Sequence, residues 1–335
     1  YTFVSLLKAC GNIPDMIEGK NIHSSVRHKN LEEDVFVGTT LVSMYGKCGN
    51  FDAARLTFNG ISKRDSASWD AMIGACSISW DVFLLFSQMQ KERLVPTDNT
   101  LAHLITACFD ANLEDARLVH LMLMEDKMNV SNEIAASLIG LYSAFGSLED
   151  SQSVFNVLCN QKCVDSWNPL INAYVKNGQG GCALEKFKEM QDRGVQPDEL
   201  TFITMLSVCM DHHSIAVGEG MNGRIIAKGF EYSVKTRVSL LDMYGRCGDL
   251  DSAVKLFRKF PTQTTEVWNA MMVVYIRFGL GKNIYSLFNR MQQEACVPNE
   301  DTYKHIFHAC ESKLHDLTTR KRYAVVMFQR IFASA

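Results

Sequence analysis

The chain repeats itself at an interval of about 100 residues, and this repetition constrains the fold more than any other feature. The dipeptide Trp69-Asp70 recurs as Trp167-Asn168 and Trp268-Asn269, at spacings of 98 and 101 residues. Longer segments recur in the same order: residues 41–58 match 138–155 and 240–257, and residues 2–10 match 100–108, 201–209 and 302–310. Such self-similarity is typical of solenoids, in which each unit packs only against its neighbours.

Each super-repeat divides into three helical hairpins of near 35, 35 and 31 residues. In the clearest hairpin, residues 164–198, the apolar spacing predicts helices over residues 166–176 and 181–193, with Gly178 ending the first. The apolar residues that share one face of the first helix are Trp167, Leu170, Ile171 and Tyr174. Helices this short cannot bury their own apolar faces and need neighbouring hairpins on both sides.

The predicted fold class is therefore all-α, a continuous α-solenoid of about ten hairpins. We expect the array to occupy residues 1–313, and residues 314–335 to form a degenerate second half of the last repeat or a C-terminal cap. The three repeated tryptophans, Trp69, Trp167 and Trp268, are expected to be buried between helices. Hairpins two, three, six, nine and ten are residues 35–65, 66–97, 164–198, 265–299 and those from 300 onwards.

Composition narrows the functions that such a fold could have. A net charge of -3 over 335 residues excludes a chain whose whole surface attracts nucleic acid, so such binding must use a local stripe. No apolar run approaches the roughly 18 residues of a membrane span, and we expect no membrane association. Cys10, Cys108, Cys209 and Cys310 occupy one repeat position, and we interpret them as small buried hydrophobes of a reducing compartment, without disulfides.

No catalytic motif stands out in the sequence. It lacks the zinc deaminase signature of His-x-Glu paired with Pro-Cys-x-x-Cys, a glycine-rich phosphate loop and a Ser/His/Asp order. We therefore expect no enzymatic activity, no cofactor and no small-molecule substrate. Two groups could hold zinc: Cys209 with His212 and His213, and His305 with His308 and Cys310. The favoured interpretation is a core cysteine beside solvated histidines in each group, so no metal is expected.

The pattern resembles the pentatricopeptide repeat (PPR) family, in particular its plant-type subclass of alternating standard, long and short (PLS) repeats. The resemblance is carried by residues 2–10, 44–49, 166–198 and 243–248, and it covers about residues 1–313. Tetratricopeptide repeats are also hairpins, but their uniform period of about 34 residues differs from the period found here. The resemblance implies a right-handed superhelix with the first helices on its concave face. It also implies a mitochondrial or chloroplast protein, of which this chain would be a fragment or processed form without the targeting segment.

The resemblance further implies single-stranded RNA as the partner, read one base per repeat with the 5′ end toward the N-terminus. Two residues in each repeat would read the base: one early in the first helix, after its aromatic residue, and the last residue before the next repeat. The pairs are Thr39 with Asp65 for guanine, Asn168 with Asp198 for uracil, and Asn269 with Asn299 for a pyrimidine, cytosine favoured. Other pairs, among them Asp70 with Thr97 in hairpin three, match no recognised combination.

Two further positions of the family concern base clamping and phosphate binding. Phe36 stands where the family usually has an aliphatic residue that sandwiches the base, whereas Asp165, Glu266 and Glu133 at this position would repel phosphate. Lys47, Lys176, Arg246 and Arg277 share the position at which family members carry a phosphate-facing lysine. A cation near the end of a helix also complements the helix dipole, and one residue can do both.

Two functions remain open. The first is sequence-specific RNA binding in organellar RNA processing, most specifically target-site recognition for cytidine-to-uridine editing, with organellar accessory proteins or a deaminase supplied in trans as further partners. The second is a protein-interaction solenoid within a larger assembly, with little or no base reading. The three matched pairs favour the first function, while the net charge, the unmatched pairs of hairpins three, five and eight, and the acidic clamp positions favour the second.

Overall fold

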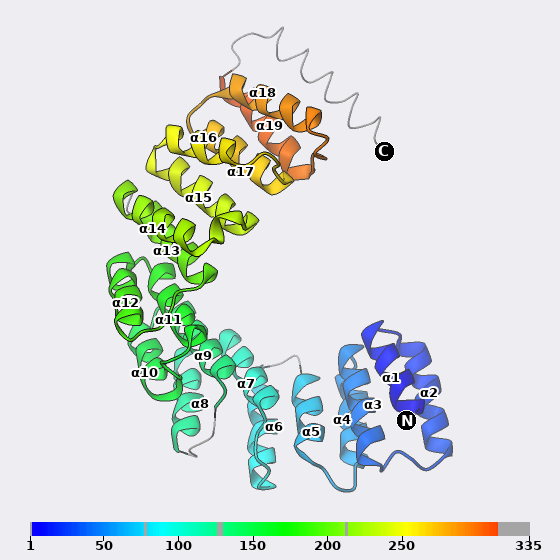
Figure 1. Ribbon diagram of the computed structural model, residues 1–335. Coiled ribbons are helices and arrows are strands. Elements are labelled where there is room, and N and C mark those ends of the chain that lie inside the picture. Colours follow the sequence, from blue (N-terminus) through cyan, green and yellow to red (C-terminus); the bar gives the residue numbers. More distant parts are fainter. Residues whose placement is uncertain (1, 77–78, 126–129, 212–213, 314–335) are drawn as a thin grey trace. The chain divides into compact units, whose positions relative to one another are not determined.

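The computed structural model describes residues 2–76, 79–125, 130–211 and 214–313. Within these ranges the chain is an α-solenoid of nineteen α-helices and one short 3₁₀ helix, and it contains no strand (Figure 1). The helices fall into two compact units, residues 1–173 and 174–335, whose boundary lies inside α11 (Val164–Lys176). The predicted all-helical solenoid is confirmed. The segment 314–335, expected to complete or cap the last repeat, lies outside the described residues.

The first unit contains five hairpins and most of α11. Its other first helices are α1 (Thr2–Asn12), α3 (Val35–Lys47), α5 (Ser66–Gly74), α7 (Asp98–Asp110) and α9 (Asn132–Ala144). Its second helices are α2 (Met16–His28), α4 (Phe51–Gly60), α6 (Ser79–Lys91), α8 (Leu113–Glu125) and α10 (Leu148–Leu158). Each first helix from α1 to α7 packs against the next first helix as well as its own second helix, so the unit has two layers.

The second unit continues the same pattern in its own part of the chain. Its first helices are α13 (Glu199–Asp211), α15 (Val234–Cys247), α17 (Thr265–Arg277) and α19 (Glu300–Lys313). Its second helices are α12 (Gly180–Asp192), α14 (Ile215–Lys228), α16 (Leu250–Lys259) and α18 (Gly281–Gln293), and the 3₁₀ helix η1 (Phe230–Tyr232) joins α14 to α15. The first helices again pack in a row, α13 on α15, α15 on α17 and α17 on α19.

The repeated tryptophans are the largest side chains of the core. Trp69, Trp167 and Trp268 are at most 1% exposed, which confirms the expected burial. Each ring meets a phenylalanine of the preceding second helix edge to face, as Trp268 does with Phe257 at 5.0 Å between ring centroids. Aromatic pairs in this geometry add about 0.5–1.5 kcal/mol to the stabilisation from burial. These contacts hold successive hairpins of a unit together.

Gly178 follows α11 as the sequence predicts, and Gly248 ends α15 in the same way. Gly248 follows α15 as a left-handed cap with φ +81°, and Gly178 follows α11 with φ +70°. Glycine adopts this conformation without the steric cost of a Cβ atom, so the chain can reverse direction into the second helix. The turns keep each hairpin short.

The described cysteines are all free thiols. Cys10, Cys108 and Cys209, which share one repeat position, are buried in the cores of their units. Among the described residues, no helix has the length and apolar character needed to cross a lipid bilayer.

Candidate nucleic-acid interface

The residue predicted to complete each base-reading pair is also the residue that caps the next first helix. In each case the backbone N–H of the third helical residue donates to its side chain: Ser68 to Asp65 at 2.8 Å, Thr201 to Asp198 at 2.8 Å, and Thr302 to Asn299 at 3.0 Å. Such a side-chain oxygen satisfies an N–H that has no partner within the helix. The start of each helix therefore holds the predicted reading oxygen in place.

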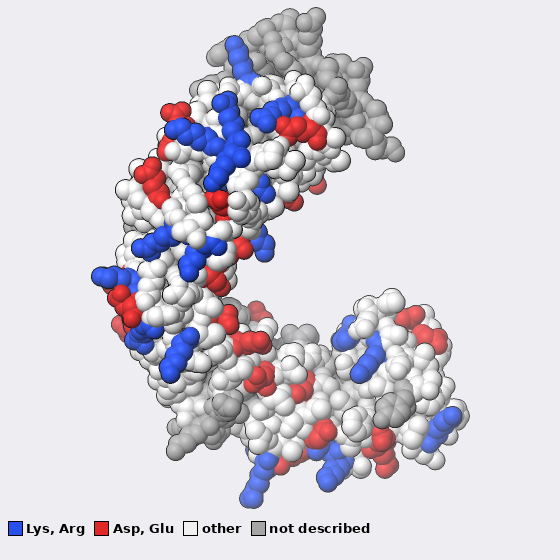
Figure 2. Space-filling model, viewed as in Figure 1, with Lys and Arg blue, Asp and Glu red and all other residues white. Residues whose placement is uncertain are grey.

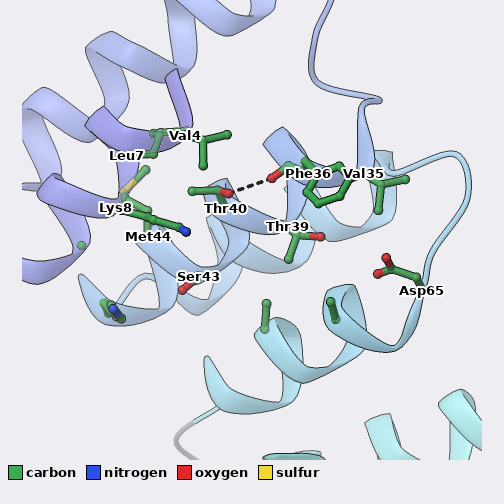
Figure 3. A pocket seen from close by; sticks show the side chains of 14 residues that line it. Val4, Leu7, Lys8, Val35, Phe36, Thr39, Thr40, Ser43, Met44 and Asp65 are labelled. Carbon is green, nitrogen blue, oxygen red and sulfur yellow. Dashed lines mark hydrogen bonds between the residues drawn. The ribbon is translucent and has the colours of Figure 1, made fainter. Parts of the chain in front are cut away.

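A cavity of about 320 Å³ lies in the first unit at hairpin two, between α1, α3 and α5 (Figure 3). Its lining includes four residues predicted to contact RNA: Phe36, Thr39, Lys47 and Asp65. The Phe36 side chain is 80% exposed, so its ring is available to a ligand and does not pack in the core. Lys8 also lines the cavity, from α1. Sequence reasoning missed Lys8, because its position depends on how α1 packs against α3.

The predicted pair of hairpin two is joined through a third residue. Ser68 Oγ donates to Asp65 Oδ1 at 2.7 Å and lies 3.0 Å from Thr39 Oγ1. Because Ser68 has one hydroxyl hydrogen and gives it to the carboxylate, Thr39 is the donor to Ser68. Both hydroxyl hydrogens are then used, and no described residue donates to Asp65 Oδ2. The pair therefore presents acceptors to the cavity.

The pair of hairpin nine is also joined through the third residue of the next helix, but it leaves N–H donors for a ligand. Asn269 Nδ2 donates to Asn299 Oδ1 at 2.9 Å, and the Thr302 hydroxyl lies within hydrogen-bonding distance of both amide oxygens, at 2.7 and 2.9 Å. Asn299 Oδ1 also accepts from the backbone N–H of Thr302, so both of its lone-pair sites are used, whereas Asn269 Oδ1 accepts only from the Thr302 hydroxyl and keeps one site. The second N–H of Asn269 and both N–H groups of Asn299 have no acceptor among the described residues, so this pair presents three N–H donors and one acceptor.

The two residues of the hairpin-six pair lie in different units and are described separately. Asn168 is 7% exposed, at the same helical position as Asn269, which is 8% exposed. The Asp198 carboxylate accepts from both the backbone N–H and the hydroxyl of Thr201, at 2.8 Å each. Asp198 is half-buried.

The four predicted phosphate-contacting cations are exposed, but three of them have polar partners. Lys47 donates to Asn12 Oδ1 at 3.0 Å. Arg246 and Arg277 share one carboxylate, Asp242, at 3.1 and 3.0 Å. The face of the second unit drawn in Figure 2 likewise shows Lys and Arg interspersed with Asp and Glu. Sequence reasoning missed Asp242, although its spacing of four residues from Arg246 is typical of an ion pair on one helix.

Three acidic residues at the clamp position are exposed: Glu133, Asp165 and Glu266. A hydrogen bond from the Thr264 side chain lowers the pKa of Glu266 below its usual value, so this carboxyl is ionised at neutral pH. A negative charge beside Asn269 disfavours a phosphate there. The clamp position of hairpin two, with Phe36, differs in that it carries no charge.

No group of three metal-ligating side chains comes together within the described residues. Of the two possible zinc groups in the sequence, the side chains of His212, His213 and Cys310 lie outside the described part of the structure.

Comparison with known proteins identifies repeats in four segments of this chain. A profile of the PPR repeat family matches residues 162–211 and 263–311, and a profile of the single PPR repeat matches residues 39–65 and 236–262. A mitochondrial pentatricopeptide repeat-containing protein of Arabidopsis thaliana is 29% identical over 328 residues, which cover 91% of this chain and 36% of that protein. A chloroplastic one from the same plant is 30% identical over 313 residues, covering 92% of this chain and 39% of that protein.

Crystal structures of other proteins show a similar fold. The crystal structure of the pentatricopeptide repeat protein PPR10 from maize matches 92% of this chain and 46% of its own length, with a TM-score of 0.63 and 20% identity. A structure of PPR10 in complex with an 18-nt psaJ RNA element matches 88% of this chain and 45% of its own length, with a TM-score of 0.60 and 15% identity. The chain thus spans less than half the length of each of these proteins.

Proposed function

Because the chain carries pentatricopeptide repeats, we propose that it binds single-stranded RNA in a sequence-specific manner. The observation that carries this proposal is the cavity at hairpin two. An exposed aromatic ring, a hydroxyl and a carboxylate that are linked through Ser68, and two lysines line it together. Recognition of a single-stranded base needs these three kinds of group: a surface for stacking, polar atoms for the base edge, and cations for the phosphate.

Hairpin two is proposed to bind guanine. Phe36 would stack on the base, and stacking on an aromatic side chain contributes about 1–3 kcal/mol per base. The Asp65 carboxylate, with Oδ2 open, accepts hydrogen bonds from the N–H groups on the guanine edge. Lys8 and Lys47 would lie near the adjoining phosphates.

Hairpin nine is proposed to bind a pyrimidine, with cytosine favoured. The pair of Asn269 and Asn299 presents three N–H donors, whereas Asn299 Oδ1 is saturated and one acceptor site remains on Asn269 Oδ1. Cytosine offers two neighbouring acceptors on its pairing edge, N3 and O2, whereas uracil replaces the first with an N–H donor. The N–H donors of the pair match the two acceptors of cytosine, so cytosine is favoured over uracil.

Hairpin six is proposed to bind uracil through Asn168 and Asp198. The uracil edge has one N–H between two carbonyl oxygens. An ionised aspartate accepts from that N–H, and an asparagine amide can donate to a carbonyl. With the 5′ end of the RNA toward the N-terminus, the three hairpins together select G, U four positions later, and C or U three positions after that.

The biological setting is part of the same proposal. The 35-35-31 pattern favours the PLS subclass, with residues 1–313 as one RNA-binding array that residues 314–335 complete or cap. The relatives named mitochondrial and chloroplastic favour an organellar location. We propose that the chain selects sites for cytidine-to-uridine editing, with accessory proteins or a deaminase supplied in trans. Crosslinking and sequencing of bound RNA from organelles should then recover the element at a constant distance from edited cytidines.

The base assignments are tested by fluorescence anisotropy with RNAs of the form GNNNUNNC and their single-base variants. Asn168→Thr gives hairpin six the Thr/Asp combination of hairpin two, and should move preference at that position from U toward G. A matched contact is worth about 1–3 kcal/mol of discrimination. Lys176→Ala combined with Arg277→Ala should weaken binding to all sequences alike and flatten the salt dependence.

The ion pairs of Asp242 favour the second function, a scaffold that binds proteins, because they occupy two of the four cations expected to contact phosphate. If the wild type binds a G-for-U variant as well as the parent RNA, and Asn168→Thr changes nothing, hairpin six does not read bases and the scaffold is the better account.

A further inference from the structure

Hairpin three, residues 66–97, contains a hydrogen-bonded pair that resembles none of the recognised combinations. The Thr97 hydroxyl donates to Asp70 Oδ2 at 2.6 Å, and the Thr100 hydroxyl donates to Asp70 Oδ1. Asp70 lies on α5 and is half-buried, Thr97 caps α7, and Thr100 is fully buried in α7. The two hydroxyl groups hold the carboxylate between them, where α5 packs against α7.

The side chains of this pair have acceptor sites left for a ligand, but no donor. Each threonine has one hydroxyl hydrogen, and Asp70 accepts both of them. A carboxylate oxygen has two lone-pair sites, so each oxygen of Asp70 keeps one site for a further hydrogen bond. The oxygen of Thr97 adds another acceptor beside them. A base that approaches this pair therefore meets two adjacent carboxylate acceptors and no side-chain donor.

Hairpin two contains the same chemical groups with the two residues exchanged. There the threonine, Thr39, lies on the first helix and the aspartate, Asp65, is the cap. A fully buried hydroxyl at the third position of the following helix completes both arrangements, Ser68 in hairpin two and Thr100 in hairpin three. The carboxylate therefore lies at a different position in each hairpin, but in both hairpins the pair offers a ligand acceptors and no side-chain donor.

We propose that hairpin three is a further base-reading unit and that it selects guanine, an inference that rests on the proposed RNA-binding function. Guanine places two adjacent donors, N1–H and N2–H, on its pairing edge, and a carboxylate accepts both side by side. Adenine and cytosine place one donor beside an acceptor, and uracil places one donor between two acceptors, so each would set an acceptor against the carboxylate. Hydrogen bonds to an ionised acceptor are roughly twice as strong as neutral ones, which magnifies the difference. The recognised element becomes GGNNUNNC.

The experiment is a fluorescence anisotropy titration of the whole chain with GGAAUAAC and with the three RNAs that carry A, C or U at the second position. The parent RNA should bind about tenfold more tightly than each of the three, the effect of about 1.4 kcal/mol of base discrimination. Asp70→Asn should abolish this preference and favour C at the second position, because the amide adds donors as in hairpin nine. Thr97→Ser, which keeps the hydroxyl, should retain guanine.

Asp52→Asn is the control, since it makes the same change in charge at an exposed position of α4. It should leave the second-position preference unchanged. If Asp70→Asn fails to fold, binding of the wild-type chain to the four second-position RNAs still tests whether hairpin three selects guanine. Equal binding of all four second-position RNAs, with guanine still preferred at the first position, would overturn the inference and leave the proposed function standing. Absence of binding to any of the RNAs would overturn both.

Discussion

Replacing Asp242 by asparagine is expected to strengthen RNA binding by the second unit. The Asp242 side chain is 31% exposed and pairs with Arg246 and Arg277, so it competes with phosphate for both guanidinium groups. Exposed ion pairs contribute about 0.2–1 kcal/mol each, so the two pairs together contribute roughly 0.4–2 kcal/mol. Since about 1.4 kcal/mol is a factor of ten, Asp242→Asn should tighten binding by about 2- to 30-fold.

Anisotropy titrations at several salt concentrations measure this effect. If each arginine gains one phosphate contact, the slope of log K against log salt should steepen by about 1.4, since a single-stranded phosphate contributes about 0.7. The control is Asp251→Asn, an equal change in charge at an exposed position on α16 of the same unit. The reasoning is refuted if Asp242→Asn changes the affinity and the slope no more than this control does.

Three other substitution and labelling outcomes follow from burial. Trp268→Ala should lower the unfolding free energy by about 3–5 kcal/mol, measured by urea denaturation, because the ring is fully buried against Phe257. Phe36→Ala should leave the urea midpoint unchanged, since the ring is 80% exposed, but weaken RNA binding by about 1–3 kcal/mol in anisotropy titrations; unchanged affinity would contradict its stacking role. Burial raises the pKa of the Cys108 thiol to about 12. Mass spectrometry after iodoacetamide at neutral pH should therefore find Cys108 unmodified and the half-exposed Cys182 modified, and early labelling of Cys108 would contradict its burial.

The helices of hairpin six could be predicted to within two residues from the sequence. The expected ranges were 166–176 and 181–193, and the observed helices are α11 (Val164–Lys176) and α12 (Gly180–Asp192). Apolar spacing and glycine positions act within one hairpin, so a single sequence carries that information. The burial of Trp268 could be predicted for the same reason, because a large ring recurs on the apolar face in each super-repeat.

The hydrogen bonds between hairpins could not be predicted. Ser68 meets Thr39 across 29 residues, and Arg277 meets Asp242 across 35. Such contacts depend on the rotation of each first helix against the next, which the helical period leaves undetermined. Which donors and acceptors a predicted base-reading pair leaves for a ligand therefore follows from the structure. The sequence supplied only the identity of its two members.

The capping role of the second pair residue limits how recognition by this array can evolve. The residues before the nine first helices of hairpins two to ten are Asp34, Asp65, Thr97, Ser131, Cys163, Asp198, Ser233, Thr264 and Asn299, and all but Cys163 belong to the four residue types that cap helices best. Six of them accept a backbone N–H of the helix, whereas Ser233 and Thr264 make no such hydrogen bond. Replacing such a cap by a residue without a side-chain oxygen costs about 0.5–2 kcal/mol of helix stability. Where the cap hydrogen bond is made, substitution at this position is restricted to residues with a side-chain oxygen, whereas the partner position inside the helix is less restricted, as Ala102, Ala136 and Val238 illustrate. New specificities would arise mainly at the helical position, and lineages would lose base reading there first while the solenoid stays folded.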